Sequence, residues 1–419
     1  MEERSTNPSP MGRDELGQRS ETVRRSNLSA IVRELHADGP LSRSELVART
    51  GLTRSAIRGL IGELVVAGLV VEARAAPLGT PGRPSPLVHL KPDGAVVLGL
   101  EIAVDSVAVA VVGLGGVVFE IARVDRPRGK SSVDETSADL AALVARVMAR
   151  RPEADRLVGI GVAMVGVVRR TDGFVSMAPN LGWIDVPLGQ RLAHALDLPA
   201  ALSVANDADL GALAELRRGA ARGADNVLFI GGGVGVGGGL IVDGKPLTGM
   251  AGYGGEVGHM PVNMNGAACR CGSVGCWETE VGQDALLVRA GYPPEGGLAG
   301  VELLLQQAAQ GSLAELAALE HVGRWLGFGL AGLINVLNPG LIVLGGHFGR
   351  IYPLVMPTLS DELDRRALAA SRALIRIVPA TLGVDAPLLG GAELAFEPLL
   401  GDPKAWAGRR NTLAVLASA

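Results

Sequence analysis

The spacing of apolar residues predicts three short helices near the start of the chain. Apolar residues recur at i, i+3, i+4 and i+7 in the stretches 28–35 and 57–64, which is the spacing of amphipathic helices. These residues are Leu28, Ile31, Val32 and Leu35 in the first stretch and Ile57, Leu60, Ile61 and Leu64 in the second. Between the two, Ser42 with Glu45 three residues later forms the pattern of a capping box and predicts a further helix.

Two of these helices are separated only by the glycine-containing turn TGLT, and this arrangement is typical of a helix-turn-helix motif. After the third helix, LVVEARA and PLVHL indicate two short strands around a loop, so we expect a winged helix-turn-helix domain over residues 21–91. Arginines at the start of the third helix and at the wing tip can reach guanine edges or phosphates. The residues expected to contact DNA are Arg54, Ser55, Arg58 and Arg83.

A helical bundle that serves as a dimerisation or regulatory cap is the alternative for this segment. Such a bundle does not require a capped helix that opens with Arg-Ser-x-x-Arg, nor a Gly-Arg-Pro loop after it. The charge also favours DNA, because residues 21–91 carry ten Arg and Lys against six Asp and Glu in a chain whose net charge is −4.

Beyond residue 91 the apolar residues alternate with small ones, as they do in strands. The stretch GAVVLGLEIAVDSVAVAVVGLGGVVFEIARV predicts three consecutive strands, and LVGIGVAMVGVV and LSVANDADL predict two more with helices between them. Strands followed by helices indicate an α/β fold. The glycines of GGGVGVGGG predict a tight hairpin and are weak evidence for phosphate binding.

Composition argues against membrane and secreted proteins. The apolar runs are broken by glycine and are far shorter than the roughly 20 residues of a membrane span. The first residues, MEERSTNPSPMGRDELGQRS, are polar and contain no apolar core of a secretory signal. We therefore expect a cytoplasmic protein that does not associate with membranes, and a disordered tail over residues 1–20.

Three segments of the chain together resemble the ROK family, named for repressors, open reading frames and kinases. They are VANDADLGALAE, GMAGYGGEVGHMPV and CRCGSVGCWETE, in this order. With the N-terminal helix-turn-helix, the resemblance is greatest to sugar-responsive repressors of the xylose-repressor and N-acetylglucosamine-repressor type. It implies a two-lobed α/β actin-like sugar-kinase fold with a sugar-binding cleft. We expect the first lobe at residues 92–205 and the second at residues 206–419, with a zinc loop at residues 259–278.

All three cysteines of the chain lie in one short window of this loop. The family's zinc ligands match His259, Cys269, Cys271 and Cys276. Independently of the resemblance, three cysteines cannot all pair within one chain, and a reducing compartment keeps thiols free or metal-bound. Three thiolates and one imidazole fill a tetrahedral zinc site, so we expect the zinc to be structural. Free cysteines beside an unrelated histidine are the alternative.

The resemblance also implies a set of sugar-binding residues. They are Asn180, Asn206, Asp207, Glu256, His259 and Glu278. Carboxylates and amides suit a ligand that presents a ring of hydroxyls. His259 would contact zinc with one ring nitrogen and a sugar hydroxyl with the other. Each carboxylate taken singly is better explained as a solvated or capping residue, and only the set in this order indicates a sugar site.

The implied nucleotide side of the cleft differs from that of the family's kinases. Those kinases carry Asp-x-Gly-Gly-Thr where this chain has EIAVD, from Glu101 to Asp105, and Gly-Thr-Gly where it has Gly-Val-Gly around Val234. The added side chains block the close backbone approach that a phosphate requires, and Asp105 adds a repelling charge. We therefore expect no ATP binding, and Asp207, which matches the catalytic base of the kinases, would be vestigial.

Together these features predict a sugar-responsive transcriptional repressor. It would bind a palindromic operator DNA as a homodimer or homotetramer, and its effector would be a sugar or a sugar derivative. Two alternatives stay open. One is an active ATP-dependent sugar kinase with a DNA-binding domain, which the retained Asp207 supports. The other is a regulator that senses a sugar phosphate or a protein partner, against which the sequence gives little.

Overall fold

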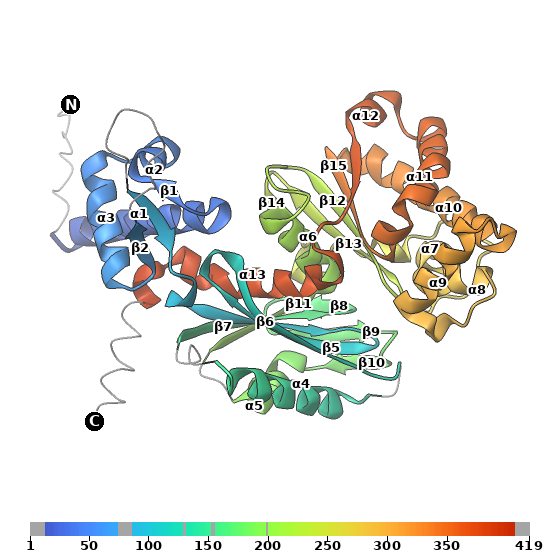
Figure 1. Cartoon of the computed structure of the whole chain (residues 1–419), viewed down its shortest axis with the longest axis horizontal. Coiled ribbons are helices and arrows are strands. Elements are labelled where there is room, and N and C mark those ends of the chain that lie inside the picture. Colours follow the sequence, from blue (N-terminus) through green and yellow to red (C-terminus); the bar gives the residue numbers. More distant parts are fainter. Residues whose placement is uncertain (1–12, 74–85, 129–130, 152–155, 198–199, 407–419) are drawn as a thin grey trace, which may run out of the picture. The chain divides into compact units, whose positions relative to one another are not determined.

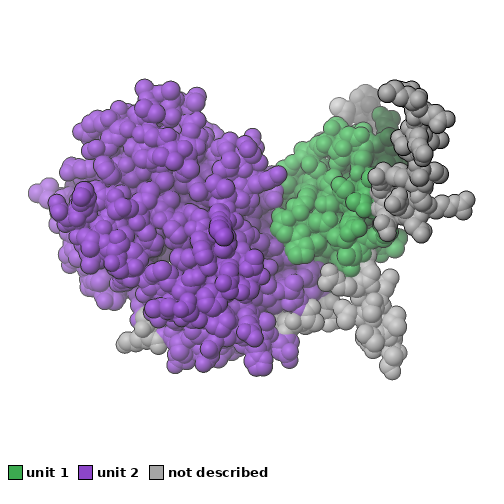
Figure 2. Space-filling model, turned by 180° about the vertical axis from the view of Figure 1, so that it is seen from behind, with its two compact units in different colours: residues 1–96, 113–117, 396–419 green, residues 97–112, 118–395 purple. Residues whose placement is uncertain are grey.

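The computed structural model describes residues 13–73, 86–128, 131–151, 156–197 and 200–406, with side chains from residue 21 onward (Figure 1). The chain forms two compact units, which are coloured separately in Figure 2. Unit 1 comprises residues 1–96, 113–117 and 396–419, and unit 2 comprises residues 97–112 and 118–395. No helix among the described residues is both long enough and apolar enough to span a membrane.

Unit 1 contains the three predicted helices. They are α1 (Arg13–Asp38), α2 (Arg43–Thr50) and α3 (Arg54–Val66). The predicted capping box is present, because the Ser42 hydroxyl accepts a bond from the Glu45 N–H and the Glu45 carboxylate accepts one from the Ser42 N–H. Gly51 ends α2 in the left-handed conformation, with φ 69°. Helix α1 begins at Arg13, within the segment that we expected to be a disordered tail.

The wing of unit 1 is built on a small antiparallel sheet in the order β1-β3-β2. Its strands are β1 (Leu41–Ser42), β2 (Val70–Ala73) and β3 (Leu87–Leu90). The two predicted wing strands are therefore present. The loop between them, including Arg83, lies outside the described residues.

Unit 1 also includes a segment from the far end of the sequence, which extends it beyond the expected residues 21–91. The Ser29 hydroxyl donates to the carbonyl oxygen of Leu400 at 2.6 Å. Arg33 donates to both carboxylate oxygens of Glu397, at 3.3 and 2.8 Å. The last turn of the final helix thus packs on α1 as part of the same unit.

The first sheet of unit 2 has the order β11-β7-β4-β5-β6. Its strands are β4 (Val96–Ile102), β5 (Ser106–Gly113), β6 (Val117–Asp125), β7 (Leu157–Met164) and β11 (Ala201–Asn206). Helices α4 (Val133–Met148) and α5 (Leu188–Leu196) and a smaller sheet of β8 (Val167–Arg169), β9 (Phe174–Ala178) and β10 (Trp183–Val186) complete this lobe. Every residue of β4 and β5 is buried, which explains their nearly continuous apolar sequence.

The second sheet of unit 2 has the order β14-β13-β12-β15-β16. Its strands are β12 (Val227–Gly232), β13 (Val236–Val242), β14 (Lys245–Pro246), β15 (Leu341–Gly346) and β16 (Arg376–Pro379). Its helices are α6 (Asp207–Arg218), α7 (Glu278–Val281), α8 (Gln283–Arg289), α9 (Gly297–Ala309), α10 (Leu313–Leu337), α11 (His347–Arg366) and α12 (Ala369–Leu374). Two five-stranded sheets with helices confirm the predicted α/β lobes.

The last helix, α13 (Ala386–Gly401), lies in the sequence of the expected second lobe but packs against the first sheet. A Cβ on Gly161 of β7 would stand 1.9 Å from the carbonyl oxygen of Gly391, so only glycine permits this approach. Gly99 of β4 meets the Leu388 carbonyl in the same way. The lobe boundary expected at residue 206 therefore does not hold for the end of the chain.

Candidate functional site

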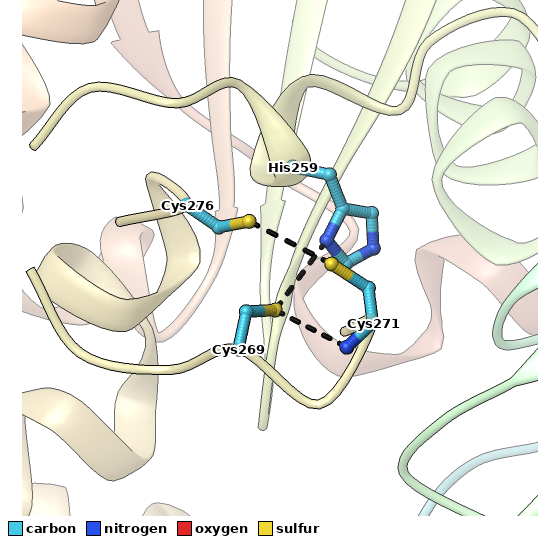
Figure 3. Close-up of side chains that lie close together, drawn as sticks. All are labelled: His259, Cys269, Cys271 and Cys276. Carbon is cyan, nitrogen blue, oxygen red and sulfur yellow. Dashed lines mark hydrogen bonds between the residues drawn. The ribbon is translucent and has the colours of Figure 1, made fainter. Parts of the chain in front are cut away.

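Four potential metal ligands point toward one another in unit 2 (Figure 3). They are His259, Cys269, Cys271 and Cys276, and their ligand atoms all lie within 4.8 Å of one another. The Sγ atoms of Cys271 and Cys276 are 3.7 Å apart, and Cys269 Sγ is 3.7 Å from His259 Nδ1. Zinc bonds of about 2.3 Å to sulfur and about 2.1 Å to nitrogen place tetrahedral ligands roughly 3.6–3.8 Å apart. The four residues therefore fit a zinc ion.

The loop that carries these ligands is fixed to helix α10. The indole of Trp277 is fully buried and its N–H donates to the Trp325 carbonyl at 2.8 Å. Glu280 accepts a bond from the Asn263 amide at 2.7 Å and lies 3.0 Å from the His321 ring. These contacts hold the loop from outside the ligand cluster, so the ligands project inward from an anchored backbone.

The surroundings of Cys269 and Cys276 favour the protonated form of these two thiols. Burial raises the pKa of both the Cys269 and the Cys276 thiol, because a thiolate is poorly stabilised away from water. Cys269 Sγ lies 2.9 Å from Glu278 Oε1, and its thiol donates to that carboxylate. A bound cation would favour the thiolate over the protonated thiol, since a coordinated thiol loses its proton.

The carboxylate of Asp207 stands where strand β11 ends and helix α6 begins. Asn206 is the N-cap of α6, and its side-chain oxygen accepts the N–H groups of Ala208 at 2.8 Å and Asp209 at 3.2 Å. The Asn206 amide also donates to the Gly166 carbonyl at 3.0 Å. Most of the hydrogen-bonding capacity of Asn206 is therefore used within the protein, where it fixes the position of Asp207.

Three carboxyl groups near this helix end are poorly stabilised as anions. Burial, with a smaller contribution from the neighbouring Glu256, raises the pKa of Asp207 to about 7. Burial likewise raises the pKa of Glu256 to about 7, with a contribution from Glu278. Asp209 is not among the residues expected from the sequence, and burial raises its pKa to about 7 as well. A cluster of this kind favours a ligand that can donate hydrogen bonds to it.

His259 lies between the carboxylates of Glu256 and Glu278. Its Nδ1 atom, which faces Cys269, is 3.8 Å from Glu278 Oε1, and its Nε2 atom is 3.9 Å from Glu256 Oε2. Nδ1 is therefore the nitrogen placed for a metal, and Nε2 lies on the side of Glu256. The double role of His259, with one ring nitrogen on zinc and the other toward a sugar hydroxyl, stays a prediction.

Asn180 lies close to Glu278. A Cβ built on Gly235 would stand 2.4 Å from Glu278 Oε2 and 3.4 Å from Asn180 Nδ2. The side-chain oxygen of Asn180 accepts a bond from Arg270 at 2.6 Å. The structure thus brings Asn180, Glu256, His259 and Glu278 into one neighbourhood, and the electrostatic contact between Asp207 and Glu256 adds Asp207 to it.

An arginine occupies the position next to Glu101, where the sequence EIAVD begins. Arg123 lies 2.8 Å from Glu101 Oε2, and its other terminal nitrogen donates to Asp385 at 2.9 Å. Burial raises the pKa of Glu101 to about 7, and Arg123 opposes that rise. A divalent cation at Glu101 would have to displace this guanidinium. No local sequence pattern indicates this pair, because Arg123 belongs to a different strand.

The residues expected to contact DNA begin helix α3 in unit 1. Arg54, Ser55 and Arg58 are all exposed. Among the described residues neither arginine forms an ion pair, whereas Arg24 and Arg43 of the same unit are paired with Glu63 and Glu72. Two unneutralised arginines at a helix N-terminus are available to an anionic partner.

Replacing Asp207 with Asn is expected to stabilise the protein at pH 8 but not at pH 5. The folded-state pKa of Asp207 is raised from 3.8 to about 7, so the folded state keeps a proton that the unfolded state has lost between those values. The free energy of unfolding therefore falls as the pH rises from about 4 to 7. At pH 5 the carboxyl is neutral, as an amide is, whereas at pH 8 it is charged.

Urea unfolding of the wild type and Asp207→Asn at both pH values measures this difference. We expect a gain on the order of 2 kcal/mol at pH 8, given a shift of several pKa units at a partly buried site. Asp185→Asn, at an exposed position, is the control and should change stability at neither pH. An equal gain at pH 5 and pH 8 would contradict the ionisation argument.

Comparison with known proteins finds relatives in one family. A model of the ROK family matches residues 97–397. The xylose repressor of Bacillus subtilis (strain 168) is 28% identical over 381 residues, which are 90% of this chain and 97% of the repressor. A glucokinase of Streptomyces coelicolor is 30% identical over 319 residues, which are 72% of this chain and 98% of the kinase. The crystal structure of a ROK family transcriptional regulator, a homologue of the E. coli MLC protein, has a TM-score of 0.72 at 24% identity and covers 93% of this chain and 98% of its own.

Proposed function

The chain belongs to the ROK family, and from this premise we propose that it is a sugar-responsive transcriptional repressor. One observation carries the proposal: the same chain contains a helix that opens with two exposed arginines, unpaired among the described residues, and a cluster of Asp207, Glu256, His259 and Glu278. The first suits DNA and the second suits the hydroxyls of a sugar. The protein would act in the cytoplasm as a homodimer or homotetramer on a palindromic operator.

The relatives support a carbohydrate effector. The Bacillus subtilis relative is a xylose repressor and the Streptomyces coelicolor relative is a glucokinase. We infer that this chain senses a neutral sugar of the pentose or hexose class. In this account Asp207, Glu256 and Glu278 accept bonds from the sugar hydroxyls, and Asn180 donates one.

A structural zinc would support this site from one side. His259 Nδ1 and the three cysteines would hold the ion, and the ion would fix the histidine ring so that Nε2 faces the Glu256 side. Four protein ligands leave no open coordination position, so the zinc would supply rigidity and no chemistry of its own.

Loss of kinase activity is the second part of the proposal. Val104 and Asp105 stand in the turn that in kinases cradles phosphate, and Asp105 is already paired with Arg128 at 3.3 Å. Arg123 neutralises Glu101 at 2.8 Å. Phosphoryl transfer depends on positioning and on charge stabilisation by cations, and both are altered here. An active kinase is the competing function, and ADP release in the presence of ATP, magnesium and sugars would establish it.

Regulation requires the sugar to bind the DNA-competent and DNA-incompetent states with different affinity. A tenfold difference corresponds to about 1.4 kcal/mol for each site. Helix α6 begins at Asp207 and the zinc loop begins at His259. A sugar that bonds to Asp207 and to His259 would therefore favour one position of the helix relative to the loop over others.

Fluorescence anisotropy with DNA from upstream of the gene tests the function. We expect salt-sensitive binding that one sugar of a panel changes by about tenfold or more, and that Asp207→Asn makes insensitive to that sugar. An Asp185→Asn control should keep the response. DNA binding that no sugar changes would refute the sensor, and absence of DNA binding with ADP release would establish the kinase instead.

A further inference from the structure

A cavity of about 700 Å³ lies beside the residues assigned to the sugar. Among the six residues expected to bind sugar, Asn180 is the one that lines it. Cavities that bind small molecules measure roughly 300–1,000 Å³. The cavity is therefore large enough for a further part of a ligand whose sugar ring is held next to it by Asp207, Glu256 and Glu278.

Asn180 joins the cavity to the sugar site. Its Oδ1 atom accepts a bond from Arg270, a cavity residue, at 2.6 Å. Its Nδ2 atom lies on the opposite side, toward Gly235 and Glu278. A ligand that contacts Asn180 from the Glu278 side thus lies next to the cavity entrance.

The cavity is lined by the residues that distinguish this chain from the kinases. Val104, Asp105 and Val234 all belong to its lining. In a kinase this space would receive the phosphates of ATP. Here the space persists while the groups that would hold phosphate are replaced, so its lining suits some other chemistry.

The charges of the cavity balance one another. Arg128 donates to Asp284 at 2.8 Å and lies 3.3 Å from Asp105, and Arg270 lies 3.6 Å from the second oxygen of Asp284. Arg126 and Glu295 add one further charge of each sign, so the lining holds three arginines and three carboxylates. An anionic guest would face these carboxylates, and a cationic guest would face arginines, so neither sign of charge is favoured.

The same lining offers alternating donors and acceptors to a neutral guest. Guanidinium groups donate only, carboxylates accept only, and the Asn180 amide does both. A sugar hydroxyl also does both, so several hydroxyls can bond to neighbouring arginines and aspartates at once. Val104, Val234 and Pro294 provide apolar surface for the carbon face of a ring.

We propose that this cavity is a second saccharide subsite, so that the effector is a disaccharide or a longer glycan. The inference rests on the proposed sugar-sensing function and specifies its ligand class. The first ring lies among Asp207, Glu256 and Glu278, and the second ring lies against Arg270 and Asp284. Arg270 determines the preference for two rings over one.

Calorimetric titration of the full chain with monosaccharides and their disaccharides tests the subsite. The probes are glucose against cellobiose, maltose and gentiobiose, and xylose against xylobiose. At least one disaccharide should bind about tenfold or more tightly than its monosaccharide. Arg270→Ala should remove this advantage, so that the variant binds each disaccharide within about twofold of its own affinity for the monosaccharide. Arg324→Ala is the matched control. The exposed fraction of the Arg324 side chain is 55%, close to the 60% of Arg270, and each of the two arginines forms an ion pair with one carboxylate.

The zinc content of Arg270→Ala is measured alongside, because the residue lies between Cys269 and Cys271. Equal affinity for each monosaccharide and its disaccharides would overturn the subsite while leaving the proposed function intact. Tighter binding of glucose 6-phosphate than of every disaccharide would also overturn it, in favour of an anion site. Binding of no sugar at all would instead refute the sensing function on which the inference depends.

Discussion

Replacing Cys276 with Ala is expected to remove zinc from the protein and to weaken sugar binding by about 100-fold. Cys276 is fully buried, and its Sγ atom lies 3.7 Å from that of Cys271. Three remaining ligands cannot close the tetrahedral site. Without the ion, His259 is no longer held against Glu256 and Glu278, and groups that orient a site in this way are typically worth 10–100-fold or more.

Zinc content by atomic absorption and sugar affinity by calorimetry measure the two effects. Val274→Ala is the control, because Val274 belongs to the same loop but is exposed and offers no metal ligand. Operator binding in the absence of sugar should persist, since unit 1 contains none of the ligands. A zinc-free Cys276→Ala protein with unchanged sugar affinity would show that the loop does not support the sugar site.

The double replacement of Arg54 and Arg58 by Ala is expected to weaken operator binding by about 100-fold or more. Both residues are exposed at the start of α3 and unpaired among the described residues. Each good arginine contact with a base is worth roughly 1–3 kcal/mol, and each lost phosphate contact also reduces the salt dependence. Each single replacement should therefore cost about tenfold.

Anisotropy at several salt concentrations measures affinity and salt dependence together. Arg24→Ala is the matched control, because Arg24 is an exposed arginine of the same unit that is already paired with Glu63. It should bind the operator within about threefold of the wild type. Sugar affinity should be unchanged in all variants. Wild-type operator binding by the double variant would exclude α3 as the recognition helix.

The local elements of this fold were predictable because their signals lie within a few residues. The capping box of Ser42 and Glu45 predicted the start of α2, and alternation predicted β4 to β6. The cysteine spacing predicted the metal cluster for the same reason, since Cys269, Cys271 and Cys276 lie in one loop. The positions of His259 and the sugar residues relative to that loop came from the family resemblance.

Contacts between distant segments were not predictable from a single sequence. Arg123 reaches Glu101 from another strand and Asp385 from 262 residues away. Arg33 pairs with Glu397 across 364 residues, which is why the C-terminal part of unit 1 was missed. The cavity beside Asn180 is likewise formed by several loops at once. Local patterns carry no information about such pairings, because they depend on how the whole chain packs.

The reciprocal effect of DNA on sugar affinity shows whether the sugar site controls operator binding. If a sugar alters operator affinity by some factor, the operator must alter sugar affinity by the same factor, because the two bindings are thermodynamically linked. The measurement is calorimetric titration of the effective sugar into the protein with and without saturating operator. We expect the sugar affinities with and without operator to differ by about tenfold or more, matching the anisotropy result. Identical sugar affinities in the two titrations would show that the sugar site and the DNA-binding helices are not coupled.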